Sequence, residues 1–118
     1  MKRLRRIKSK KAMATSITDD VRKAVFLRDK GKCVLCGSET SVKSNAHFIP
    51  RSQGGMGIEE NIITLCDEFS KNQCHYKFDN GPKEEREEKR EKIRAYLKSK
   101  YPNWDEEKLK YKKWSDLS

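Results

Sequence analysis

The chain has few apolar residues and no long run of them. Only 34% of its 118 residues are hydrophobic, whereas 39% are charged. A chain of this length fits one folded domain but has little material for a large apolar core. No stretch approaches the roughly 20 apolar residues of a membrane span, and the N-terminal sequence MKRLRRIKSKK lacks the apolar segment of a secretory signal. We therefore expect a cytoplasmic protein with no membrane partner, whose small core needs another source of stability.

The four cysteines are the candidate for that source. They form two groups, Cys33-x2-Cys36 and Cys66-x7-Cys74. In a reducing cytosol, a CxxC pair joined to a later pair is typical of a tetrahedral zinc site, and disulfides are the less favoured alternative. We predict a structural Zn²⁺ bound by four thiolates. His75 follows Cys74 directly and could instead complete a site of three cysteines and one histidine.

The net charge of +10 is distributed unevenly. Residues 1–11 contain seven basic residues and no acidic ones, whereas residues 12–82 carry nine of each sign. A basic arm beside a neutral domain predicts binding to a polyanion, most simply nucleic acid, because the contact releases counterions. The alternative is a solubilising tail without a partner. The arm residues that we expect to contact nucleic acid are Lys2, Arg3, Arg5 and Arg6.

The sequence divides into three segments: a basic, flexible arm over residues 1–15, a domain over 16–82 and a charged helical extension over 83–118. The domain is expected to contain, in order, a helix opened by the S-x-x-D pattern at 16–19, a CxxC turn over 32–38, a strand over 43–49, a loop over 50–60, a strand over 62–65 and a helix over 70–80. Alternation in the first strand places His47 and Ile49 on its inner face. In the extension, an apolar stripe is expected on a charged helix at Ile93, Tyr96, Leu97 and Tyr101. A further short helix should carry Leu109, with Trp104 and Trp114 as packing anchors and base stacking as the alternative.

Three residues of the domain could carry chemistry. His47 ends the first strand, and its usual pKa of about 6.5 suits a general base at neutral pH. His75 and Asp79 stand four residues apart on one helix face and could hold a divalent cation. Taken singly, a structural histidine and an intrahelical ion pair are the ordinary explanations. The combination favours catalysis because both histidines, Asn61, a glycine-rich turn and the cysteines fall within one segment.

The sequences AHFIPRSQGG, ENIITLC and CHYKFDNG carry a family resemblance. Over about residues 22–81 the chain resembles the HNH endonucleases with a four-cysteine zinc frame, which are ββα-metal (His-Me finger) nucleases, and particularly the small ones of phages and prophages. The resemblance implies an α+β fold in which a zinc-stapled ββα-metal core is flanked by N-terminal and C-terminal helices. A phage or prophage gene would place the protein in the cytoplasm of a bacterial host cell.

The resemblance also implies a metal-dependent DNA endonuclease that leaves 5′-phosphate and 3′-hydroxyl ends. In that family pattern His47 activates water, Asn61 pins the loop or approaches the metal, and His75 binds a catalytic Mg²⁺, Mn²⁺, Ni²⁺ or Zn²⁺. Asp79 matches a second metal ligand. Arg51 is a candidate phosphate clamp, with a solvated loop cation as the alternative. A small-molecule substrate is not expected.

Two departures from the family pattern leave a second hypothesis open. Ala46 stands where many members have an acidic or histidine metal ligand. The second cysteine pair is lengthened by residues 67–73, where Asp67 and Glu68 are more simply solvated loop acids but could approach a metal. The alternative function is a non-catalytic, zinc-stapled DNA-binding module. A related possibility is an adaptor of a phage packaging complex that docks through its C-terminal helices to terminase or other packaging proteins.

Overall fold

The computed structural model of the chain describes residues 9–112, so Lys2, Arg3, Arg5, Arg6 and Trp114 lie outside the described residues. The elements in chain order are α1 (Lys10–Thr15), α2 (Asp19–Arg28), β1 (Val42–His47), η1 (Arg51–Gln53), β2 (Ile62–Cys66), α3 (Cys74–Asn80), α4 (Lys83–Lys100) and η2 (Glu106–Leu109). The described fold is α+β, as predicted, and its two strands form one antiparallel sheet. Among residues 9–112, no helix combines the length and apolar character that crossing a membrane requires.

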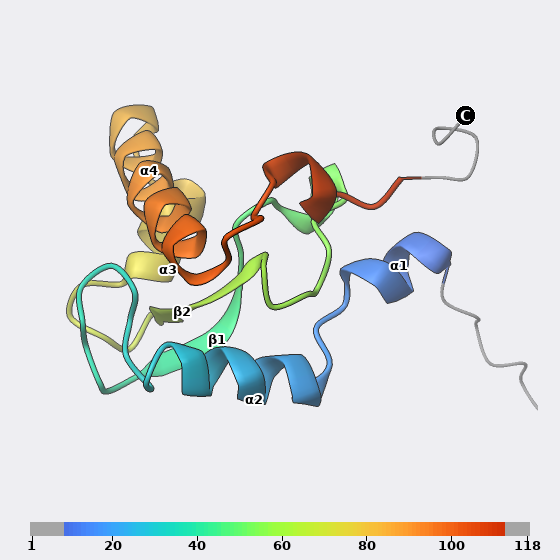
Figure 1. The fold of residues 1–118 in the computed structure, drawn as a ribbon. Helices are drawn as coiled ribbons and strands as arrows, with labels where there is room; N and C mark the ends of the chain where they lie inside the picture. The colour runs from blue at the N-terminus through green and yellow to red at the C-terminus, as the bar shows by residue number, and fades with distance from the viewer. Residues whose placement is uncertain (1–8, 113–118) are drawn as a thin grey trace, which may run out of the picture.

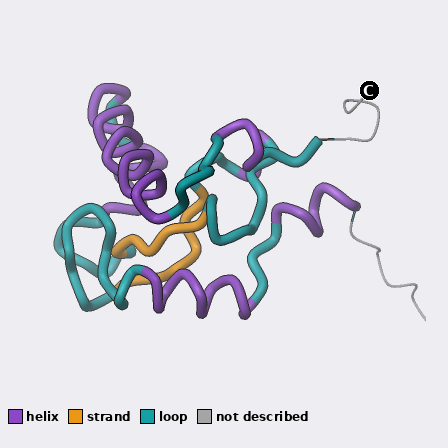
Figure 2. Tube along the Cα trace, viewed as in Figure 1, coloured by secondary structure: helices purple, strands orange, loops and turns teal. Residues whose placement is uncertain are grey.

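The sheet lies between helices on two sides. Figure 1 shows α2 along one side of the strands and α4 on the other, and Figure 2 separates the two strands from the surrounding helices by colour. The core gathers between them, where Phe48, Ile63 and Leu65 from the strand region meet Ile93 and Leu97 of α4, all with no exposed surface. Apolar burial therefore holds the strands to α4.

The N-terminal region differs from the expected flexible arm over residues 1–15. Residues 10–15 form α1, because Ser9 caps the helix through its Oγ, which accepts from the Ala12 N–H at 3.0 Å. Ser16 does not open the next helix: its Oγ donates to the Ala12 carbonyl at 2.6 Å. Thr18 is the N-cap of α2 instead, accepting from the Val21 N–H at 3.2 Å.

Strand β1 is shorter than predicted and faces the core differently. Ser44 and Ala46 are buried, whereas His47 is only partly buried, with an irregular register between Lys43 and Ala46. The expectation that His47 lies on the inner face is therefore wrong. Ile49 is buried because the chain has left the strand by that point, and its backbone is held by the side chain of Asn61.

Helix α3 begins at Cys74, later than the predicted capping box at residues 70–73. Gln73 has a left-handed backbone (φ 43°) that cannot continue from a preceding helical turn. Ser70 still acts as a local cap, since its Oγ accepts from the Gln73 N–H at 3.0 Å. The helix therefore starts at one of the four cysteines and is only seven residues long.

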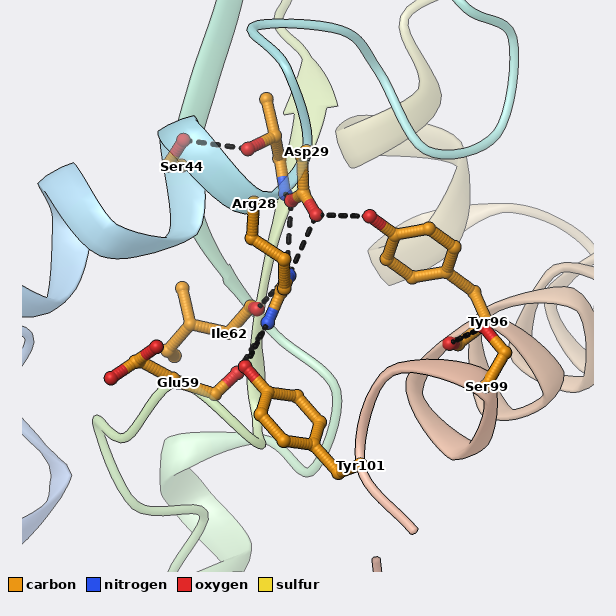
Figure 3. A network of polar contacts seen from close by, with 9 residues as sticks. Arg28, Asp29, Ser44, Glu59, Ile62, Tyr96, Ser99 and Tyr101 are labelled. Atoms are coloured by element: carbon orange, nitrogen blue, oxygen red, sulfur yellow. Dashed lines mark hydrogen bonds and ion pairs between the residues drawn. The ribbon is translucent and has the colours of Figure 1, made fainter.

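A polar network at the end of α2 ties together distant parts of the chain (Figure 3). Arg28 forms a bidentate ion pair with Asp29 (Nε to Oδ1 2.7 Å, Nη2 to Oδ2 3.0 Å). Its guanidinium also donates to the carbonyl of Ile62 at 2.7 Å and to the Tyr101 hydroxyl at 3.1 Å. The Tyr96 hydroxyl donates to Asp29 as well. The network joins α2, β2 and the end of α4.

The C-terminal segment crosses the glycine-rich loop that follows β1. Met56 N–H donates to the Leu109 carbonyl at 2.8 Å, and Tyr111 N–H donates to the Gly54 carbonyl at 2.7 Å. Trp104 packs edge-on against Phe48 (centroids 5.6 Å apart) and donates its Nε1–H to the Glu60 carbonyl at 2.8 Å. Trp104 is thus a packing anchor, and this segment holds the loop that carries Arg51.

Candidate active site and metal centre

The four cysteines converge from three separate elements. Cys33 and Cys36 lie in the turn before β1, Cys66 ends β2 and Cys74 opens α3, and one sulfur from each lies within 4.8 Å of all the others. Cys36 Sγ and Cys66 Sγ are 3.7 Å apart. Thiolates at 2.3 Å around one zinc are separated by about 3.8 Å, so the donor set suits tetrahedral Zn²⁺. In the described part of the chain, these cysteines are the one group of three or more potential ligands that could hold an ion.

Burial makes four adjacent thiolates unfavourable unless a cation is bound. Burial raises the pKa of Cys33 and of Cys74. Burial acts in the same direction on Cys36, but hydrogen bonds from Asn72, Ser38 and the neighbouring cysteines bring its pKa down to about 7. Two backbone N–H groups also point at sulfur, Cys36 N to Cys33 Sγ at 3.5 Å and Cys74 N to Cys66 Sγ at 3.2 Å. Four adjacent thiolates need a positive charge to coexist, and a metal supplies it.

His75 does not join the cysteine cluster. Its Nε2 lies 3.3 Å from Asp79 Oδ2, one helical turn farther along α3. The alternative of a site with three cysteines and one histidine is therefore not what the structure forms. Cys74 and His75 are adjacent on the helix and leave it in different directions, so one faces the cluster and the other faces a separate hollow.

That hollow, of about 370 Å³, brings His47, His75 and Asp79 together with Arg51. Asn45, Pro50 and Ser52 complete its lining. His47 and Asn45 come from alternate positions of β1, Arg51 comes from η1 and the other two come from α3. The end of the first strand, the loop after it and the short helix thus converge on one polar site.

His47 is oriented by a residue that sequence reasoning did not single out. Its Nε2 lies 2.9 Å from the backbone carbonyl of Thr15, in the link between α1 and α2. A carbonyl can only accept, so Nε2 carries the proton and Nδ1 keeps its lone pair. Burial lowers the pKa of His47 against the opposing effect of the Thr15 carbonyl, and the charge of Arg51 lowers it further. The neutral imidazole is therefore the favoured form at neutral pH.

His75 and Asp79 form the candidate cation site. Their imidazole and carboxylate face each other at 3.3 Å, and their side chains are 28% and 52% exposed. Two ligands of one octahedral ion at about 2.1 Å lie roughly 3 Å apart, so both could contact the same cation with water and substrate completing its shell. The pair suits Mg²⁺, Mn²⁺, Ni²⁺ or Zn²⁺ by ligand type, and the geometry does not choose among them.

Asn61 has a structural task close to the hollow. It is fully buried, and its Oδ1 accepts from the Ile49 N–H at 2.8 Å while Nδ2 donates to the carbonyls of Ile49 (3.2 Å) and Met56 (2.8 Å). Both ends of the loop over residues 49–56 are held by this one amide. Of the two roles predicted for Asn61, the geometry corresponds to pinning the loop.

Arg51 is exposed at the rim of the hollow. Its Nη2 lies 3.4 Å from Ser16 Oγ, and its guanidinium also borders a second hollow of about 430 Å³ that contains Arg22. His47 and Asn45 line both hollows. Arg51 is placed to meet an anion beside His47, and no carboxylate within ion-pair distance of it is found in residues 9–112.

Ala46, Asp67 and Glu68 do not line this hollow. Ala46 is 1% exposed and belongs to the apolar core, opposite Ile63 of β2. Asp67 is buried against its own turn, where Oδ1 accepts from the Phe69 N–H at 2.9 Å. Residue 46 therefore faces the apolar core and not the hollow, and a small apolar side chain fits that position.

Asn45 and Thr15 are the residues that the sequence did not reveal. Asn45 could have been found from its place two residues before His47, on the same face of a strand. Its Oδ1 is buried without a hydrogen-bond partner in the described structure. The contact of Thr15 with His47 could not be predicted from the sequence, because a backbone atom makes it across a separation of 32 residues.

Comparison with known proteins gives one partial match. The chain is 34% identical over 50 residues to the protein named Anaredoxin from Nostoc sp. (strain PCC 7120 / SAG 25.82 / UTEX 2576). The matched segment is 42% of this chain and 59% of that protein. No protein-family profile and no solved structure matches the chain.

Proposed function

We propose that the protein is an HNH-type, metal-dependent endonuclease that hydrolyses DNA phosphodiester bonds. The observation that carries the proposal is the convergence of a neutral, oriented His47 with His75, Asp79 and Arg51 in one hollow. The order β1, β2, α3, with the cysteine cluster at the first residue of α3 and the hollow beside His75 and Asp79, supports a zinc-stapled ββα-metal core. The resemblance of residues 22–81 supplies the family assignment.

In the proposed reaction, each residue has a task that follows from its contacts. His47 holds its Nε2–H on the Thr15 carbonyl and accepts the proton of a water molecule at Nδ1. Arg51 binds phosphate oxygens and orients the scissile group. Asn61 keeps the loop over 49–56 in place, and this fixes the position of Arg51 relative to His47. The water oxygen bonds to phosphorus as the bond between phosphorus and the 3′ oxygen breaks, and the 3′ oxygen takes a proton from solvent, which gives 5′-phosphate and 3′-hydroxyl products.

His75 and Asp79 would hold the divalent cation. When bound there, the cation neutralises charge on the phosphate and on the leaving oxygen. The role of the chain's own residues is to fix the two ligands on one face of α3, and the adjacent cysteine cluster anchors the first turn of that helix. The structural metal and the catalytic metal are thus assigned to neighbouring but separate residues.

The basic arm and the packaging partners remain predictions. Lys2, Arg3, Arg5 and Arg6 lie outside the described residues. We propose that they supply sequence-independent affinity for DNA. Docking to terminase or other phage packaging proteins rests on the family resemblance, as does a location in the bacterial cytoplasm.

A plasmid-nicking assay tests the proposal. Zinc-replete protein is incubated with supercoiled plasmid and, separately, Mg²⁺, Mn²⁺, Ni²⁺ or added Zn²⁺, with a parallel series for His47→Ala. We expect cleavage with at least one added metal and a rate lowered about 10² to 10⁴-fold in the variant, because general-base catalysis contributes that much. DNA affinity and zinc content should stay unchanged.

His75→Ala should instead raise the metal concentration needed for half-maximal cleavage. Lys89→Ala, at a partly buried residue of α4 that lines neither hollow, is the matched control and should cut like wild type. Cleavage at wild-type rate by both histidine variants would overturn the active-site assignment. A wild-type protein that binds DNA tightly but cuts with none of the metals would support the non-catalytic binding module.

A further inference from the structure

We propose that the groove between α2 and β1 binds an unpaired nucleotide of the DNA substrate, next to the bond that is cut. The groove has a volume of about 690 Å³ and is lined on one side by Phe26 and Leu27 of α2 and on the other by β1. The inference rests on the proposal that DNA occupies the hollow at His47. It adds a substrate class, DNA with an unpaired or displaced strand.

The first supporting observation is the apolar surface of the groove. Phe26 is 47% exposed and Leu27 is 75% exposed, although both belong to a small protein with little apolar material. The Phe26 ring rests on Gly31, where an added Cβ would come within 2.9 Å of Cζ. An anchored, half-exposed aromatic ring is the kind of surface on which an unstacked base packs.

The second observation is charge. Arg22, Lys23 and Lys43 border the apolar surface, and none of the described residues lining the groove is acidic. Two of these cations have acidic neighbours, Arg22 with Asp19 at 3.0 Å and Lys43 with Asp67 at 3.7 Å. The Asp19 side chain is 85% exposed, so the Arg22 pair is solvated and phosphate can compete for the guanidinium. A base-stacking surface with a cationic border complements single-stranded nucleic acid.

The third observation is continuity with the candidate active site. Asn45 lines the groove, the hollow at His75 and the hollow between Arg22 and Arg51. A strand whose phosphate lies at His47 could therefore place a neighbouring nucleotide over Phe26 without leaving the surface. The side chain of Asn45 lies at this junction, and its Oδ1 is buried without a hydrogen-bond partner in the described structure.

Binding measurements separate the groove from catalysis. Zinc-replete protein is titrated, with no divalent cation added, against a fluorescent blunt duplex and against the same duplex carrying a short unpaired oligo-dT flap. We expect wild type to bind the flapped DNA at least about 5-fold more tightly, and Phe26→Ala to lose most of that preference, because base–aromatic stacking has about this effect. Phe69→Ala, a 78% exposed aromatic on the loop before α3, should keep the preference.

The role of the basic residues beside the groove is tested through the salt dependence of DNA binding. Lys23→Gln and Lys43→Gln should each lower the slope of log K against log salt for the flapped DNA by up to about 0.7. Lys89→Gln on α4 should leave the slope unchanged. Melting temperature and zinc content of every variant establish that it is folded.

The outcomes distinguish this inference from the endonuclease proposal. The inference fails if wild type shows no preference for the flap, or if Phe26→Ala and Lys23→Gln bind both DNAs as wild type does. The groove would then serve another partner, such as a peptide pairing with β1. This conclusion would hold even if the plasmid is nicked. If the preference depends on Phe26 but no metal supports nicking, the groove stands and the endonuclease proposal fails.

Discussion

The Nε2 of His47 lies 2.9 Å from the backbone carbonyl of Thr15, so a segment outside the ββα unit sets the tautomer of the candidate general base. Thr15 is itself fixed, since its Oγ1 donates to the Lys11 carbonyl at 2.8 Å within α1. The adjoining loop is tied to the same segment by the Gly57 N–H, which donates to the Ala14 carbonyl at 3.0 Å. The N-terminal helix is thus part of the site's architecture.

Gly57→Ala should disturb this relationship. A Cβ at residue 57 would lie 2.0 Å from the carbonyl oxygen of Ser16, so the link between α1 and α2 must move. We expect slower cleavage and a change in the His47 ring nitrogen signals by ¹⁵N NMR, because Nε2 loses its fixed acceptor. Zinc content and the unfolding midpoint serve as controls for folding. Wild-type ring signals in this variant would show that Thr15 does not set the tautomer.

The pH dependence of cleavage should report His47. Its pKa lies below the usual value because burial disfavours the charged form, and in the proposed reaction the neutral ring, with Nδ1 unprotonated, is the active form. Activity should therefore rise with pH through a midpoint below about 6.5 and then level off. The measurement is kcat/KM against pH at constant salt and saturating metal.

The same pH profile should be measured for a variant of Arg51. Its charge helps to lower the pKa of His47, so Arg51→Gln should move the rising limb to higher pH as well as weaken substrate binding. Arg86→Gln on α4, whose guanidinium donates to Gly81, is the control and should leave the midpoint in place. A midpoint unchanged in Arg51→Gln would separate the arginine from the base and leave it only a binding role.

The cysteine cluster was predictable because its signal is local spacing, and its four members converge as expected. The start of α3 was not, because Gln73 adopts a left-handed conformation that side-chain chemistry did not indicate. The face of His47 was misjudged for a similar reason: the register slips between Lys43 and Ala46, and alternation alone assumes an unbroken strand. Contacts made by backbone atoms of distant residues, such as Thr15, leave no trace in sequence patterns.

Removing the zinc that we expect at the cysteine cluster should unfold the core and the candidate site together. The cluster joins the turn before β1, the end of β2 and the start of α3, and apolar burial is limited. We expect about one zinc per chain by elemental analysis, and a large drop in melting temperature after chelation or in Cys33→Ser. Ser38→Ala, next to the turn, should retain zinc. Zinc-free protein with an unchanged melting temperature would contradict a structural role.

Arg28→Met should be among the most destabilising single changes outside the cysteine cluster. The side chain of Asp29 is 1% exposed and that of Arg28 is 11% exposed, so removing the guanidinium leaves a buried carboxylate without its bidentate partner. The carbonyl of Ile62 also loses a donor. The loss in free energy of unfolding should be about 3 to 5 kcal/mol, measured by denaturant titration.

The matched control for that change is Arg22→Met, on the same helix. Its ion pair with Asp19 has side chains that are 49% and 85% exposed, so water already screens the interaction. The expected loss is about 1 kcal/mol or less. Equal losses in the two variants would mean that the Arg28 network is solvated in solution and does not join α2 to β2 and α4. A selective loss at Arg28 would locate a main source of tertiary stability in a polar contact, as expected for a chain in which charged residues (39%) outnumber hydrophobic ones (34%).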